Sequence, residues 1–234
     1  ARRIRPVTLL EALQKAVDTR VNKRWLARME EDGTMTANQF AWRIGGSPAD
    51  PSDILAAIIE DARLFNETLA ILLEDCSEAF DSMTDEALTI ALQVSGTDVK
   101  LINWILRARR NQRRVVITQG GVSPLTTAML VEGGVQGLPR TPTDWTKLLH
   151  HILEFAHTQG GEGYELKTEV FGTIYRGVKL SDIAYGDDLT PMDARLENAI
   201  RTAQASAILL AANNIRSQGA KSKFLMSEQL YRAK

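Results

Sequence analysis

The sequence is short of cysteine, of long apolar runs and of excess positive charge. Cys76 is the single cysteine among 234 residues, so an internal disulfide is excluded and a reducing, intracellular compartment is expected. No apolar run reaches the roughly 18 residues that a membrane span needs. Lysine and arginine total 28 against 29 acids, so the net charge of −1 does not predict a large basic surface for nucleic acid. These features do not distinguish the nucleus from an organelle.

The residues that are present indicate one ordinary globular core, since 44% are hydrophobic and 24% are charged. Strands and helices alternate along the chain in a pattern typical of an α+β fold, in which helices pack on an antiparallel sheet. The apolar spacing predicts helices over 8–17, 21–31, 53–65, 85–94, 98–109, 142–158 and 191–213. Strands are expected over 67–75, 113–118, 127–132, 165–172 and 178–184.

Three carboxylates occupy positions where they can meet. Asp75 ends an apolar run, and Asp187 and Asp188 follow Gly186 in a sequence that suits a tight hairpin turn. Carboxylates at a strand end and in a turn repel one another unless a cation neutralises them. Mg²⁺ is the natural occupant because it prefers hard oxygen ligands, and two such ions about 4 Å apart serve in phosphoryl transfer. The alternative is that the acidic pair lies in a solvated turn.

Six segments resemble, in order and approximate spacing, blocks of the reverse transcriptase domain of non-LTR (LINE-type) retrotransposons and their relatives. The resemblance extends from about Arg5 to about Phe224, which is nearly the whole chain. The segments are 5–10 (Arg-Pro-Val-Thr-Leu-Leu), 38–47, 75–82 (Asp-Cys-Ser-Glu-Ala-Phe-Asp-Ser, resembling the first palm motif), 133–142 (resembling the second palm motif), 185–188 (Tyr-Gly-Asp-Asp) and 221–223 (Lys-Ser-Lys, resembling the lysine motif).

This resemblance implies a polymerase palm, an antiparallel sheet backed by helices, with partial helical fingers and no thumb. Residues 1–66 are then a partial fingers-like segment and 67–226 the palm-like reverse transcriptase core. Residues 227–234 would begin a missing thumb or tail.

The resemblance also implies roles for the acidic motifs and for the lysine motif. Asp75 and Asp187 would bridge two Mg²⁺ ions, for which Mn²⁺ can substitute, and Asp188 would be a supporting ligand. Lys221 resembles the lysine proposed to protonate the departing pyrophosphate.

Four further residues would contact the incoming nucleotide. Arg5 would grip the triphosphate, a task that suits a guanidinium group. Phe80 would pack against the sugar and exclude a 2′-hydroxyl, while Gln136 and Gly137 would lie beside the nucleotide. The alternatives are that Arg5 is a solvated arginine, that Phe80 is a core aromatic and that Gln136 and Gly137 form a polar turn.

The densest basic cluster lies at and after the end of the helix expected at 98–109. It has two interpretations of equal weight, a track for a template or primer backbone and a solvated helix end at which cations meet the dipole. His150, His151 and His157 lack partners at zinc spacing and are expected to be surface or core residues. The cluster comprises Arg107, Arg109, Arg110, Arg113 and Arg114.

The expected activity is that of an RNA-directed DNA polymerase using an RNA template, a DNA primer and dNTPs. Gly186 stands where the family usually has alanine and gives the form typical of viral RNA-directed RNA polymerases, whereas Phe80 favours deoxynucleotides. The rival hypothesis is a domain without catalysis, acting as a structural or binding subunit of a larger protein or ribonucleoprotein assembly. The near-neutral charge, Glu132 and the unusual Arg140-Thr141 of the second palm motif favour it.

Overall fold

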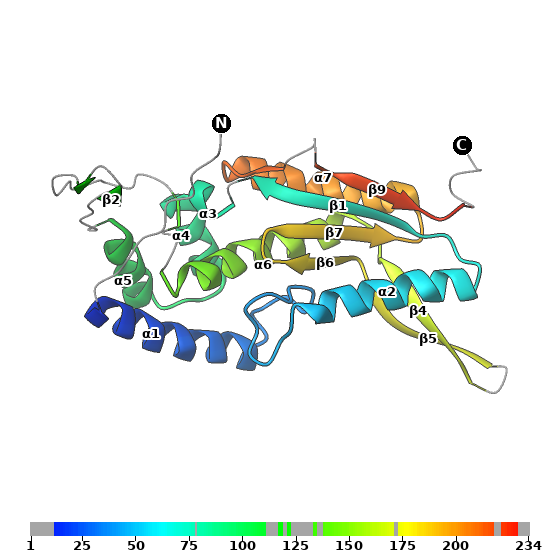
Figure 1. Cartoon of the computed structure of the whole chain (residues 1–234), viewed down its shortest axis with the longest axis horizontal. Helices are drawn as coiled ribbons and strands as arrows, with labels where there is room; N and C mark the ends of the chain where they lie inside the picture. Colours follow the sequence, from blue (N-terminus) through cyan, green and yellow to red (C-terminus); the bar gives the residue numbers. More distant parts are fainter. Residues whose placement is uncertain are drawn as a thin grey trace.

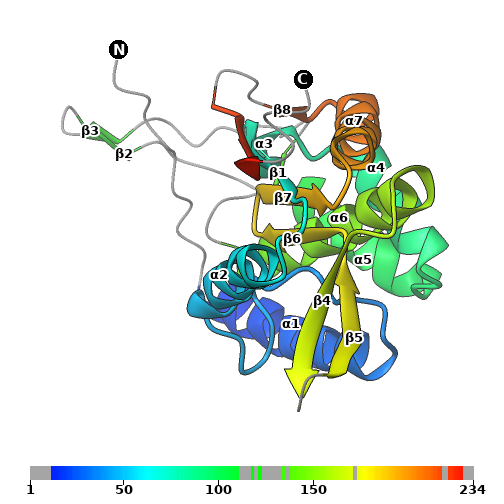
Figure 2. The ribbon, with the colours of Figure 1, turned by 90° about the vertical axis from the view of Figure 1, so that its right-hand side faces the viewer.

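The architecture is a central antiparallel sheet with helices on both of its faces. The computed structural model describes residues 12–77, 79–110, 117–118, 121–122, 133–134, 138–170, 173–217 and 221–228. Figure 2 shows α4, α6 and α7 on one side of the sheet and α2 on the other. The α+β palm-like class expected from the sequence is confirmed.

The described helices alternate with strands along the chain (Figure 1). They are α1 (Ala12–Glu31), α2 (Ala49–Leu64), α3 (Ala79–Ser82), α4 (Asp85–Val94), α5 (Val99–Arg110), α6 (Thr141–Gln159) and α7 (Leu196–Ala212). Local chemistry explains α4 well. Thr84 caps it by accepting a 3.0 Å hydrogen bond from the Ala87 N–H, and Asp85 and Glu86 lie in its first turn, where the helix dipole favours negative charge.

The central sheet has the strand order β6-β7-β1-β8, and β9 also pairs with β1. Two further hairpins, β2–β3 and β4–β5, lie outside it, and Figure 1 shows the β4–β5 hairpin projecting beyond α2. The strands are β1 (Ala70–Ser77), β2 (Ile117–Thr118), β3 (Gly121–Val122), β4 (Tyr164–Val170), β5 (Thr173–Leu180), β6 (Asp182–Tyr185), β7 (Asp188–Asp193), β8 (Arg216–Ser217) and β9 (Lys223–Met226).

Four of the expected elements have different limits in the structure. The helices expected at 8–17 and 21–31 merge into α1 within the described residues, because no glycine or proline interrupts residues 12–31. The helix expected at 191–213 begins only at Leu196, since 188–193 form β7 and pair with β1. The strand expected at 178–184 is divided at Ser181 between β5 and β6. The strands expected at 113–118 and 127–132 lie outside the described residues, apart from β2.

Two apolar clusters bury the faces of the sheet. One includes Trp145 and Leu149 of α6, together with Leu88 of α4. The other joins Ile58 of α2 to Ile71 of β1. Because α2 packs directly on the sheet, the boundary expected between residues 66 and 67 crosses a shared core, and the proposed division into domains stays a prediction. Among the described residues, no helix is long and apolar enough to cross a membrane.

The end of α6 is tied to β6 by an ion pair that makes stability depend on pH. The His157 Nε2 atom contacts the buried Asp182 carboxylate, and this hydrogen bond raises the pKa of His157, although burial of the ring opposes it. The pKa of His157 in the unfolded chain is about 6.5, and the ion pair stabilises the fold fully at pH values below it. This stabilisation is lost as the pH rises through the raised folded pKa.

We therefore expect the His157→Gln variant to be less stable than the wild type at about pH 6. The difference in the free energy of unfolding should decrease as the pH rises to about 8.5. Urea unfolding at several pH values measures this difference. Burial raises the pKa of Glu74 to about 7, which also lowers stability as the pH rises, but Glu74 is present in both proteins and cancels in the comparison. Parallel stability curves for the two proteins would contradict the prediction.

Candidate active site

The two acidic motifs of the sequence meet at one end of the central sheet. Asp75 of β1 is the direct partner of Asp188 of β7 in the antiparallel register, and Asp187 lies in the turn between β6 and β7. The Cys76 N–H donates a 3.2 Å hydrogen bond to the Asp187 carbonyl. In Figure 1 this is the left-hand end of the sheet, where β1 ends and the β6–β7 hairpin turns. The expected hairpin and the expected convergence of the strand end with the turn are both present.

The three carboxylates influence one another electrostatically. Burial raises the pKa of Asp188, the charges of Asp187 and Asp75 raise it further, and Lys221 lowers it. Burial raises the pKa of the Cys76 thiol to about 12, together with the charges of Asp187, Glu74, Asp75 and Asp188. Cys76 is buried and therefore stays a neutral thiol, as expected of a small core residue rather than a reactive one.

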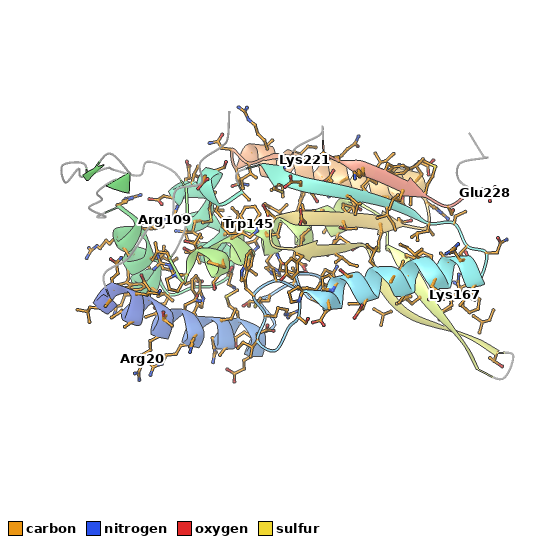
Figure 3. All side chains as sticks on the ribbon, viewed as in Figure 1. Arg20, Arg109, Trp145, Lys167, Lys221 and Glu228 are labelled. Atoms are coloured by element: carbon orange, nitrogen blue, oxygen red, sulfur yellow. The ribbon has the colours of Figure 1, made fainter. Side chains whose placement is uncertain are left out.

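Lys221 supplies the counter-charge on this side of the sheet. Its Nζ atom lies 2.5 Å from Asp75 Oδ2, and the side chain remains 61% exposed. Strand β9, which pairs with β1, begins two residues later and so brings the lysine to the carboxylates (Figure 3). In this way the first palm motif and the lysine motif, far apart in sequence, become neighbours.

The carboxylate set suits a hard cation in its chemistry, because it offers anionic oxygens beside one another. Within the described part of the chain, no three His, Cys, Asp or Glu side chains are arranged so that they could hold a metal ion as they stand. One Asp75 oxygen is bound to the Lys221 ammonium group. A cation shared by the three acids would therefore need that oxygen to be released.

The hairpin turn that carries Asp187 is held from beneath by two buried side chains. The Gly186 carbonyl accepts hydrogen bonds from Trp145 Nε1 at 2.7 Å and from Gln39 Nε2 at 3.3 Å. The Gly186 N–H donates to Gln39 Oε1 at 3.2 Å. Gly186 has φ +67°, and Asp187 is not in the positive-φ region, which is the pattern of a type II′ turn. The backbone therefore favours glycine here.

Gln39 reaches the turn because its segment pairs with the edge of the sheet. The Phe40 N–H donates to the Ala184 carbonyl at 2.9 Å, and the Ala184 N–H donates to the Asn38 carbonyl at 2.8 Å. In the sequence, Gln39 lies in the segment 38–47 that resembles a family block, but no role for Gln39 or Trp145 follows from the sequence. A buried glutamine and a buried indole have no signature in the sequence that separates them from surface or core residues.

An aromatic cluster adjoins the turn. Phe80 packs edge-on to Trp42, with ring centroids 5.7 Å apart and planes at 75°, and lies 5.8 Å from Trp145. Phe80 is half-buried and packs against the main apolar cluster, as a core aromatic does. Its role in sugar selection stays a prediction.

The glycine pair of the second palm motif packs on the turn that follows β1. The Gly134 N–H donates to the Phe80 carbonyl, and the Gly133 N–H donates to the Met83 carbonyl at 3.0 Å. Gly133 has φ +94°, and a β-carbon there would lie 2.5 Å from the Asp81 carbonyl oxygen, so only glycine fits. Gln136 and Gly137, expected beside the nucleotide, lie outside the described residues, as does Arg5.

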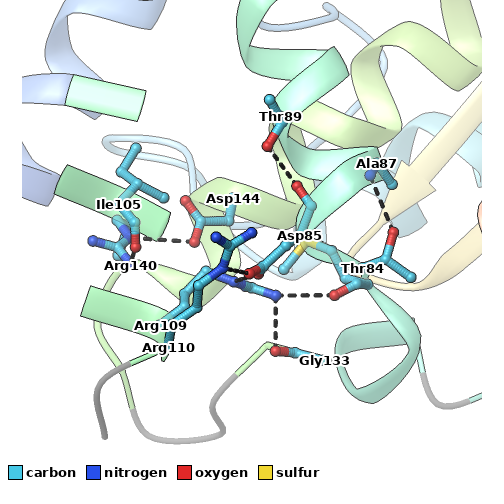
Figure 4. Close-up of polar contacts among 11 residues, drawn as sticks. Thr84, Asp85, Ala87, Thr89, Ile105, Arg109, Arg110, Gly133, Arg140 and Asp144 are labelled. Atoms are coloured by element: carbon cyan, nitrogen blue, oxygen red, sulfur yellow. Dashed lines mark hydrogen bonds and ion pairs between the residues drawn. The ribbon is translucent and has the colours of Figure 1, made fainter. Parts of the chain in front are cut away.

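The basic cluster at the end of α5 divides into buried and exposed members. Arg109 is 4% exposed, lies 2.6 Å from Asp85 and donates to the Gly133 carbonyl at 2.8 Å (Figure 4). It therefore joins α4, α5 and the second palm motif, and its guanidinium group does not face outward for a phosphate. Arg107 and Arg110 are exposed, although Arg110 also pairs with Asp85. Arg113 and Arg114 lie outside the described residues.

Arg140, one of the departures from the family pattern, has a structural explanation. Its buried guanidinium lies 3.2 Å from Asp144 and 3.7 Å from Asp18, and 5.1 Å from the centre of the Trp104 ring. Burial raises the pKa of both acids, while Arg140 opposes that rise. The unusual arginine thus joins α1 and α6 through charges that would be costly to leave unpaired.

We expect the Trp145→Phe variant to lose more stability than the loss of ring volume explains, because the Gly186 carbonyl loses its shortest hydrogen bond. The additional loss should be about 1–3 kcal/mol in the free energy of unfolding. Trp25→Phe is the matched control, since Trp25 is also buried, in α1. Urea unfolding compares the variants, and equal losses would mean that the Gly186 hydrogen bond adds nothing.

Comparison with known proteins adds two similarities. No protein-family model matches the sequence. Over 166 residues, the chain is 29% identical to the Retrovirus-related Pol polyprotein from type-1 retrotransposable element R2 of Nasonia vitripennis. This match covers 69% of the chain and 14% of the polyprotein.

The fold is shared with telomerase. Apo telomerase from Candida tropicalis, truncated from its C-terminal domain, superposes with a TM-score of 0.61 at 11% identity over 92% of the chain and 41% of the telomerase. Telomerase from Candida albicans in complex with a fragment of telomeric RNA gives a TM-score of 0.57 at 12% identity, over 92% of the chain and 34% of the telomerase. The chain thus spans less than half the length of these proteins. The resemblance is confirmed: this chain has the reverse transcriptase fold and is similar in sequence to the non-LTR retrotransposon R2.

Proposed function

We propose that the chain forms the palm and part of the fingers of an RNA-directed DNA polymerase, which extends a DNA primer with dNTPs on an RNA template. The observation that supports it most is the convergence of Asp75, Asp187 and Asp188 at one end of the sheet. The reverse transcriptase fold and the similarity to R2 agree with this activity.

In the proposed reaction the 3′-oxygen of the primer attacks the α-phosphorus of the dNTP, and the bond from that phosphorus to the pyrophosphate oxygen breaks. Asp75, Asp187 and Asp188 would hold Mg²⁺, two ions in the expected arrangement or Mn²⁺ in their place, which supplies positive charge to the phosphate oxygens when bound. The Lys221 ammonium group, which lies beside Asp75, would give a proton to the departing pyrophosphate.

The chain's remaining contribution is to hold these groups in position. Gln39 and Trp145 fix the backbone of the turn, which sets where Asp187 and Asp188 point. Phe80 lies beside this turn, where a bulky ring would exclude a 2′-hydroxyl and select deoxynucleotides.

Nucleic acid is the proposed macromolecular partner. A telomerase of the same fold has been solved with an RNA fragment, and the exposed Arg107 and Arg110 offer this chain cations for phosphates. The near-neutral charge limits what this chain contributes on its own, which agrees with its being a small part of a protein the size of the R2 polyprotein.

We expect Asp187→Ala to reduce primer extension on an RNA template by at least about a hundredfold, because several kcal/mol of stabilisation by the bound cation would be lost. Extension in Mg²⁺ or Mn²⁺ with dNTPs measures this effect. The matched control is Asp53→Asn, which removes an exposed carboxylate of α2 remote from the site. Equal extension by wild type and Asp187→Ala would contradict the site. If the wild type neither extends nor binds a primer–template duplex, the non-catalytic subunit is the better description.

Lys221 provides a second test, because its ammonium group and a metal ion would compete for Asp75. We expect Lys221→Met to bind Mn²⁺ about threefold to tenfold more tightly, since a neighbouring positive charge is removed. Electron paramagnetic resonance measures free Mn²⁺ during the titration. Extension by the variant should nevertheless be slower, because the proton donor is absent. Lys223→Met removes an exposed charge two residues away and is the control. Unchanged Mn²⁺ affinity in Lys221→Met would rule out the competition.

A further inference from the structure

Trp42 adopts a backbone conformation that bulky residues rarely adopt. Its φ is +60°, in the left-handed region where the β-carbon is crowded by the backbone. Such a conformation costs free energy and persists only where the surrounding structure imposes it, most often near a functional site. Trp42 is also 38% exposed, although its ring is large and mainly apolar.

The loop is clamped on both sides of Trp42. On one side, Gln39 Oε1 accepts a 3.0 Å hydrogen bond from the Ala41 N–H, while the same side chain binds Gly186. On the other side, Arg43 donates two hydrogen bonds to Glu30 of α1, at 3.0 Å and 2.8 Å. A third, from Arg43 Nη1 to the Ala37 carbonyl at 3.2 Å, closes the loop on itself. These contacts hold the loop in the conformation that strains Trp42.

The strained backbone sends the indole ring to the candidate active site. The Trp42 Cη2 atom lies 3.4 Å from the position a β-carbon on Gly186 would take, so the ring covers the residue before Asp187. The same ring meets Phe80 edge-on at 5.7 Å. Trp42 therefore contacts both the turn that carries the carboxylates and the aromatic residue expected to select the sugar.

Phe80 packs against one fully buried ring and one partly exposed ring. Trp145 is fully buried and is fixed by its hydrogen bond to the Gly186 carbonyl. The second ring, Trp42, is partly exposed and meets Phe80 edge-on at 5.7 Å. If Trp42 were absent, the Phe80 ring would gain room to turn away from Trp145.

We propose that Trp42 is a positioning residue for sugar selection, which presses the Phe80 ring against Trp145 so that it excludes the 2′-hydroxyl of a ribonucleotide. The preference for dNTPs over rNTPs then depends on two rings, of which only Phe80 faces the sugar. The effect on substrate choice rests on the proposed polymerase function, whereas the effect on Phe80 does not. Aromatic pairs of this geometry are favourable beyond their buried area, so losing one ring should release the other.

The first experiment compares variants that separate the ring from the strain. Glycine adopts φ +60° without strain, so Trp42→Gly removes the ring and leaves the loop its path. We expect the ratio of kcat/KM for dNTPs to that for rNTPs to fall about fivefold to tenfold, mainly through better use of rNTPs. Trp42→Phe should restore most of the ratio. Ile44→Ala removes an exposed apolar side chain from the same loop and should leave the ratio unchanged.

A double variant tests whether Trp42 acts through Phe80. If it does, Trp42→Gly combined with Phe80→Ala discriminates no less than Phe80→Ala alone, because the ring being positioned is already gone. Additive losses in the double variant would overturn the proposal. An equal fall in kcat/KM for both nucleotide types in Trp42→Gly would also overturn it, since that pattern means a general structural role.

The second experiment does not need polymerisation. The chain is labelled with 4-fluorophenylalanine, and the fluorine resonance of Phe80 is assigned by its loss in Phe80→Leu. We expect this resonance to shift in Trp42→Gly and to stay in place in Ile44→Ala, because only the former removes the neighbouring indole ring. An unchanged resonance in Trp42→Gly would overturn the proposal even in an active enzyme. A shifted resonance in a chain that neither extends primers nor binds a primer–template duplex would support the positioning of Phe80 and refute the polymerase function instead.

Discussion

The candidate site depends on the hydrogen bonds that hold the backbone of Gly186. Gln39 and Trp145 satisfy the carbonyl, and Gln39 also satisfies the N–H, so the peptide groups on either side of this residue are fixed from inside the protein. Buried polar groups that are fully paired are costly to disturb, because breaking one leaves an unpaired group in a medium of low polarity. The three residues come from an edge segment, from α6 and from the hairpin turn, so the turn cannot move without moving the whole palm.

Charge is the second constraint on the fold. The acids at the end of the sheet are balanced on the protein side by Lys221, while Arg109 and Arg140 lie inside the structure beside Asp85, Asp144 and Asp18. These cations are therefore paired with acids of the same chain and do not contribute to a basic surface.

Sequence patterns predicted local structure well where one chemical signal dominated. The apolar spacing predicted a helix over 85–94, which are the limits of α4, and Gly186 with its two acids marked the hairpin. The predictions failed where pairing with a distant strand decided the outcome. Residues 191–193 have a composition that a helix accepts, but their backbone groups pair with β1, so the helix begins later. Arg109 was also expected in an exposed basic cluster, but it is buried because it pairs with Asp85 on another helix.

The sequence by itself determined the α+β class, the hairpin turn and the identity of the three carboxylates, because each follows from short-range periodicity, turn chemistry or a contiguous motif. Only the tertiary structure decided which residues support that site. Gln39 is 147 residues and Trp145 is 41 residues from Gly186 along the chain. Their roles, and that of Trp42, arise from contacts that form when the segments pack. Hydrogen bonds and ring contacts between distant segments depend on three-dimensional distance, and spacing along the chain does not encode that distance.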